Sequence, residues 1–112
     1  MTVEQLIQSA IFQVVTAGEN TAETEISKPY CCDLLSIAMS GAPAGCAWCT
    51  VMANLNTIAV ATLTETGCII LTSNTKMDDV AISKAKAEGI TVLSTPLASF
   101  DAALKIYQLL NG

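Results

Sequence analysis

Continuous apolar runs recur along the chain at residues 46–52, 68–72 and 90–94. Runs of this kind are typical of strands that are buried on both faces, as in a parallel sheet. Residues 11–15 are rich in β-branched and aromatic side chains and predict a further strand. A short strand is expected over residues 25–28, because Pro29 limits how far it could extend. The pattern therefore predicts about four or five strands.

Between these runs the apolar residues return every three or four positions, which predicts helices. Thr2 and Gln5 have the spacing of a capping box, so a first helix is expected after Thr2. Each remaining helix has a polar residue or pair where it is expected to begin: Asp33, Asn54, Thr75 and Thr95–Pro96. The apolar positions expected to line the last helix are Phe100, Ala103, Leu104 and Tyr107.

Strands that alternate with helices imply right-handed crossovers and a mainly parallel sheet. The expected fold class is therefore α/β, with three layers, α/β/α, and helices on both faces of the sheet. The length of 112 residues fits one domain. No linker, internal repeat or low-complexity segment divides the chain, so residues 1–112 are expected to form a single domain.

The composition is unusually apolar for a small protein. Hydrophobic residues make up 52% of the chain and charged residues only 13%, against a typical charged share of about 25%. Sheet faces that are both covered, together with an interface to another subunit, would account for this excess. We therefore expect a homodimer.

The most apolar stretch, residues 46–72, is interrupted by polar residues and a glycine. It lacks the ~20 continuous apolar residues that a membrane-spanning helix needs, so no membrane partner is expected. The first residues show no basic segment followed by an apolar one, so no signal peptide is expected. Five cysteines, an odd number, without such a signal are typical of a reducing cytosol. The expected location is cytoplasmic.

The net charge of −5 argues against nucleic acid as a partner, because phosphate backbones are bound by clustered lysine and arginine. The basic residues are scattered lysines: Lys28, Lys76, Lys84, Lys86 and Lys105. A small phosphorylated ligand is still compatible with this charge, since backbone N–H groups at helix N-termini bind anions without basic side chains.

The chain has no histidine and no arginine. Without histidine there is no Ser-His-Asp triad, no Cys-His pair and no histidine metal ligand. Neither a G-x-x-x-x-G-K-[ST] phosphate-binding loop nor a G-x-G-x-x-G motif is present. We therefore expect no enzyme activity, no catalytic residue and no cofactor.

Cys46 and Cys49 form a C-x-x-C motif, which in other settings carries redox or metal chemistry. In a strand, however, positions i and i+3 point to opposite faces and lie roughly 10 Å apart, which is too far for a disulfide. Buried core thiols are therefore the favoured interpretation, and Trp48 between them is expected in the core as well. A redox role, or a Cys₄ metal site with Cys31 and Cys32, is the alternative.

Polar residues follow the three buried strands predicted above. In chain order they are Asn54 and Asn56, then Ser73 to Thr75, then Ser94 and Thr95. The carboxyl ends of parallel strands meet at one edge of the sheet, and ligands bind there in open α/β folds. Helix capping is the alternative role for the asparagines and for the aspartate that precedes the second helix. The predicted ligand-binding residues are Asp33, Asn54, Asn56, Ser94 and Thr95.

Several segments of the chain, in the same order, resemble the DRTGG domain family. They are residues 32–36, 47–51, 54–61, 68–70 and 89–96, followed by Phe100. The resemblance covers most of the chain, most clearly from Tyr30 onward, and implies an α/β fold like the N-terminal domain of the bacterial HPr kinase. It also implies a regulatory role and self-association, as in related domains of phosphotransacetylases and of inorganic pyrophosphatases with CBS domains.

The leading hypothesis is a non-catalytic regulatory module that forms a homodimer and binds a small, nucleotide-like ligand at the strand ends. The alternative is a structural module that docks on a larger enzyme, which a large exposed apolar patch would favour. A cysteine-based redox or metal-binding protein is the third hypothesis.

Overall fold

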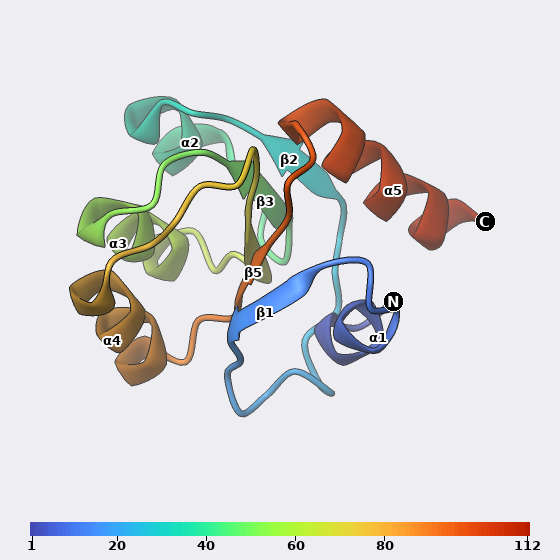
Figure 1. Cartoon of the computed structure of the whole chain (residues 1–112), viewed down its shortest axis with the longest axis horizontal. Coiled ribbons are helices and arrows are strands. Elements are labelled where there is room, and N and C mark those ends of the chain that lie inside the picture. The colour runs from blue at the N-terminus through green and yellow to red at the C-terminus, as the bar shows by residue number, and fades with distance from the viewer.

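Five strands form one sheet in the order β1-β5-β4-β3-β2 in the computed structural model, which describes residues 1–112 (Figure 1). Strands β2 to β5 run parallel, and β1 lies antiparallel beside β5. The strands are β1 Gln13–Thr16, β2 Pro29–Cys31, β3 Ala47–Thr50, β4 Cys68–Leu71 and β5 Val92–Ser94. The helices are α1 Val3–Gln8, α2 Leu35–Gly41, α3 Leu55–Leu63, α4 Asp79–Glu88 and α5 Ser99–Asn111.

The helices cover both faces of the sheet. Helices α2, α3 and α4 lie side by side on one face, and α1 and α5 lie on the other (Figure 1). Each face has its own cluster of buried apolar side chains, one of twelve residues under α2, α3 and α4 and one of eleven under α1 and α5. The prediction of a three-layer α/β fold with a mainly parallel sheet is confirmed.

Strands β3 and β4 are buried on both faces, as their continuous apolar runs predict. Cys46, Trp48 and Ile69 belong to the cluster under α2, α3 and α4, whereas Cys49 and Ile70 belong to the one under α1 and α5. Cys46 and Cys49 are therefore buried on opposite faces of the sheet, as expected for positions i and i+3 of a strand. Trp48 is fully buried, as expected, and its indole N–H donates a hydrogen bond to the Cys32 carbonyl (2.9 Å).

The strand expected over residues 25–28 is wrong, because the strand that pairs with β3 begins at Pro29 instead. Proline is tolerated as the first residue of an edge strand, and β2 is the edge strand on this side of the sheet. Residues 25–27 instead join other parts of the fold. Glu25 forms an isolated bridge with Thr2, and the Ser27 N–H donates to the Gly45 carbonyl (2.9 Å).

Two of the predicted helix starts are correct. Thr2 and Gln5 form the expected capping box of α1, and Asn54 caps α3 by accepting hydrogen bonds from the backbone N–H groups of Asn56 and Thr57. Helix α3 ends at Leu63, where Thr64 is its C-cap.

The other helix starts are displaced from the predicted positions. Helix α4 is capped by Asp78, not Thr75, because residues 73 and 74 have positive φ and turn the chain before the helix begins. Helix α5 begins after Ala98, because the Thr95 hydroxyl accepts a hydrogen bond from Leu97 N–H and forms a local turn (3.2 Å). Helix α2 has Leu34 at its N-cap, and Asp33 does not cap it.

The apolar line predicted for α5 lies mainly on its outer face. Phe100 is 71% exposed, Tyr107 57% and Leu104 40%, whereas the buried side chains of the helix are Ala102 and Ile106. The sequence places apolar residues on two sides of this helix, and the side that carries Ala102 and Ile106 packs on the sheet. No helix is both long enough and apolar enough to span a membrane.

Candidate functional site

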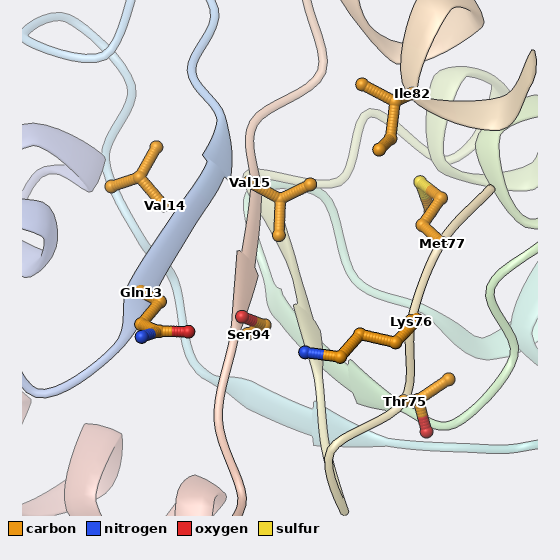
Figure 2. A pocket seen from close by; sticks show the side chains of 8 residues that line it. All are labelled: Gln13, Val14, Val15, Thr75, Lys76, Met77, Ile82 and Ser94. Carbon is orange, nitrogen blue, oxygen red and sulfur yellow. The ribbon is translucent and has the colours of Figure 1, made fainter. Parts of the chain in front are cut away.

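A pocket of about 450 Å³ lies beside the carboxyl end of β5 (Figure 2). It lies between β1 and β5 on one side and the segment Thr75–Met77 with α4 on the other. The antiparallel register places Gln13 of β1 directly opposite Ser94 of β5. The edge strand β1 thereby extends the sheet past the parallel strands and provides one wall of the pocket.

The turn after β4 positions the opposite wall. Ser73 and Asn74 both adopt positive φ, 56° and 59°, and their N–H groups donate to the Leu97 and Thr95 carbonyls (2.7 and 3.1 Å). These bonds tie the turn to the connection between β5 and α5. The chain then continues through residues 75–77 to the Asp78 cap of α4, and this course brings Lys76 over the pocket.

The pocket is polar at one end and apolar at the other. Figure 2 shows the Lys76 amine and the Gln13 carboxamide directed toward the strand that carries Ser94. At the other end the side chains are apolar. They are Val15, Met77 and Ile82, which belong to or pack against the buried cluster under α2, α3 and α4. Lys76 is the charged residue of the lining, so the polar end favours an anionic group and the apolar end a flat or aliphatic one.

Of the predicted site residues, Ser94 is the one that lines this pocket. Thr95 is buried directly beside it, and its hydroxyl is occupied by the Leu97 N–H. The remaining three lie at the carboxyl ends of β2 and β3, nearer the opposite edge of the sheet: Asp33, Asn54 and Asn56.

Asp33 joins two strand ends. Its Oδ1 accepts hydrogen bonds from the Thr50 hydroxyl (2.8 Å) and the Val51 backbone N–H (2.9 Å). The Asn54 side chain is likewise occupied, by the first N–H groups of α3, while Asn56 is exposed in the first turn of that helix. The structure thus gives Asp33 and Asn54 local hydrogen-bonding roles, and contact of these residues with a ligand stays a prediction.

The buried cysteines are divided between the two faces of the sheet. No group of three or more His, Cys, Asp or Glu side chains is placed to hold a metal ion. Burial raises the pKa of the Cys46 and Cys49 thiols and raises that of Cys68 to about 12. These thiols are therefore mainly protonated at neutral pH, so they bind metal ions weakly and react slowly as nucleophiles.

No family model and no curated protein matches the sequence. Among solved structures, the fold is similar to the crystal structure of the CBS and DRTGG domains of the regulatory region of Clostridium perfringens pyrophosphatase, complexed with the activator diadenosine tetraphosphate. The TM-score is 0.73 at 16% sequence identity, and the match covers 94% of this chain and 45% of that chain. The chain shares its fold with part of this regulatory region. That likeness supports the fold expected from the DRTGG resemblance, and family membership stays a prediction.

Proposed function

We propose that this chain is a non-catalytic regulatory module of the cytosol that senses a small, nucleotide-like ligand. The observation that carries the proposal is the pocket beside β5, with a lysine at its polar end and an apolar wall at the other. Its volume of about 450 Å³ falls within the range of small-molecule sites, roughly 300–1,000 Å³.

The lining suits a phosphorylated ligand with an apolar part. The Lys76 ammonium would pair with phosphate oxygens, and the Gln13 carboxamide and Ser94 hydroxyl supply further hydrogen bonds beside it. Met77 and Ile82 offer the kind of surface against which a base packs. The regulatory region with the similar fold is complexed with diadenosine tetraphosphate, an activator of that pyrophosphatase. We propose that a ligand of the same class, a nucleotide, binds to this chain as well.

The lining supports sensing in preference to catalysis. Lys76 is its ionisable side chain, with no carboxylate, thiol or phenol beside it in the pocket. General acid–base chemistry needs a donor and an acceptor within hydrogen-bond reach of the reacting group. A ligand would therefore be held here without being changed.

Replacing Lys76 with glutamine is expected to weaken nucleotide binding about tenfold, the effect of losing one charge-assisted hydrogen bond of about 1.4 kcal/mol. With ATP or diadenosine tetraphosphate at 100 times its Kd, the wild-type protein should gain about 2.7 kcal/mol of stability. That gain corresponds to a rise in Tm of about 10 °C. Thermal unfolding with and without each nucleotide measures both effects.

The matched control is Lys105→Gln, which removes the same charge from an exposed position on α5, outside the pocket. This variant should keep the wild-type response to nucleotide. Equal responses of Lys76→Gln and the wild-type protein would contradict the proposed site, and no shift in the wild-type protein at millimolar nucleotide would contradict a nucleotide ligand.

We further propose that the module self-associates through the outer face of α5. Phe100, Leu104 and Tyr107 recur at helical spacing and are 40–71% exposed, and a line of this kind is typical of an interaction surface. Sedimentation velocity should give the mass of a dimer for the wild-type protein and of a monomer for the Phe100→Ser, Tyr107→Ser double variant. Leu63→Ser, which changes a residue 70% exposed on α3, should stay dimeric. A monomeric wild-type protein would overturn self-association and favour docking on a larger enzyme.

A further inference from the structure

Cys31 of the edge strand β2 and Cys49 of β3 are direct partners in the parallel register. Residues in register on neighbouring parallel strands point to the same face, and neighbouring strands lie about 4.8 Å apart. Disulfides join Cα atoms that are about 4.4–6.8 Å apart. The pair therefore meets the backbone requirement that Cys46 and Cys49, on opposite faces, do not.

The two thiols differ in how far solvent reaches them. Cys31 is exposed, and its Sγ lies 3.7 Å from the carbonyl oxygen of Ser99, the first residue of α5. Cys49 is fully buried among the side chains under α1 and α5. One sulfur is thus accessible to a reagent, and the other is sheltered next to it.

The thiols also influence one another. Burial raises the pKa of both, and the Cys49 thiol partly offsets this rise at Cys31, whereas Cys31 adds to it at Cys49. Part of this mutual effect comes from a hydrogen bond between the two thiols, which needs neighbouring sulfur atoms, whereas Cys46 and Cys68 act on Cys49 through charge alone. A raised pKa leaves little thiolate at neutral pH, so thiol–disulfide exchange at this pair is slow.

No other two cysteines are register partners on neighbouring strands. Cys68 lies opposite Ala47 in the register, Cys46 lies on the other face of the sheet, and Cys32 follows Cys31 directly in the chain. We propose that Cys31 and Cys49 form a thiol-modification site that reacts with a small-molecule disulfide, such as oxidised glutathione, and closes an internal disulfide between β2 and β3.

The reaction takes two exchanges. The Cys31 thiol gives its proton to solvent, and the thiolate attacks one sulfur of the small disulfide, which breaks that bond and releases one thiol. The Cys49 thiol then transfers its proton to the departing thiolate as its sulfur attacks the Cys31 sulfur of the mixed disulfide, so that the second thiol is released and the Cys31–Cys49 bond forms. The two protein thiols are oxidised by two electrons, and the small disulfide is reduced to two thiols.

The disulfide would covalently join the edge strand β2, which precedes Asp33, to its neighbour β3. It would enclose residues 31–49, including α2, in a covalent loop and so restrict the unfolded chain. Strand β2 lies at the opposite edge of the sheet from β1 and the pocket. Disulfide formation at this edge therefore does not depend on ligand binding in the pocket beside β5.

The test is to incubate the reduced full chain with excess oxidised glutathione, quench with acid and map the products by mass spectrometry. We expect the loss of two hydrogens, a Cys31–Cys49 peptide crosslink and a Tm higher by about 5–10 °C. Dithiothreitol should reverse all three. Cys32→Ser, the neighbouring thiol, should leave these results unchanged, and Cys31→Ser, an exposed position, should abolish the crosslink and the rise in Tm.

A stable glutathione adduct on Cys31, a crosslink through Cys32 or between two chains, or five free thiols after incubation would each overturn the proposal. Because Cys31 is exposed and Cys32 is only half-buried, their serine variants should fold, and circular dichroism of the reduced variants checks that they do.

Discussion

Replacing Trp48 with alanine should lower the free energy of unfolding by about 3–5 kcal/mol, the usual cost of truncating a buried aromatic side chain to alanine. Trp48 has no exposed surface and lies in β3, an inner strand of the sheet, within the cluster under α2, α3 and α4. The change also removes the indole N–H that satisfies the Cys32 carbonyl. Since small domains are stable by only about 5–15 kcal/mol, this variant should be close to the limit of folding.

Urea unfolding followed by circular dichroism measures this effect, because Trp48 is the one tryptophan and its fluorescence is lost with it. Trp48→Phe is the matched control, since it keeps most of the buried surface and loses the N–H. It should cost about 1–2 kcal/mol, mainly for the unsatisfied carbonyl. An alanine variant as stable as the phenylalanine one would show that the Trp48 site is not tightly packed.

Replacing Gly18 with alanine should lower the free energy of unfolding by about 1–3 kcal/mol, because an added methyl group has no space. A Cβ at this position would lie 2.3 Å from the Gly89 carbonyl oxygen. That oxygen belongs to the backbone, so it cannot move aside as a flexible side chain could. The Gly18 N–H also donates to the Thr91 hydroxyl (3.0 Å), just before β5. Accommodating the methyl group would move the end of β1 away from the start of β5.

Gly89→Ala separates this steric effect from a conformational one. Gly89 ends α4 with φ of 71°, and a Cβ there would meet nothing within 4 Å. Its replacement should cost about 1 kcal/mol, for the left-handed backbone alone. Urea unfolding followed by Trp48 fluorescence compares the two variants, and a smaller loss for Gly18→Ala than for Gly89→Ala would contradict the close approach of the two loops.

The layers and most strands could be predicted from the sequence because burial of β3 and β4 on both faces leaves continuous apolar runs. The direction of the first strand could not be predicted, because the apolar pattern of residues 11–15 is the same for a parallel and an antiparallel strand. Helix starts were predictable where one side chain caps the next N–H groups, as at Thr2 and Asn54. They were displaced where a turn comes first, as before Asp78.

The candidate site also has one residue that the sequence predicts and two that it does not. Ser94 was predictable because it is the polar residue that ends a buried strand, at the edge where ligands bind. Gln13 and Lys76 were missed, since Gln13 reaches the pocket only through the antiparallel pairing with β5, and Lys76 only through the turn at Ser73 and Asn74. Both depend on contacts between segments distant in sequence, which a local pattern of apolar and polar residues does not encode.

The most direct test of ligand sensing is a backbone amide NMR titration of the full chain with diadenosine tetraphosphate, and with ATP in parallel. We predict that the amide signals that shift will cluster at residues 13–15, 75–77 and Ser94, around the pocket beside β5. Saturation should occur at a tenfold higher ligand concentration in Lys76→Gln. Unchanged spectra at millimolar nucleotide, or shifts confined to Asp33, Asn54 and Asn56 at the other edge of the sheet, would contradict this account.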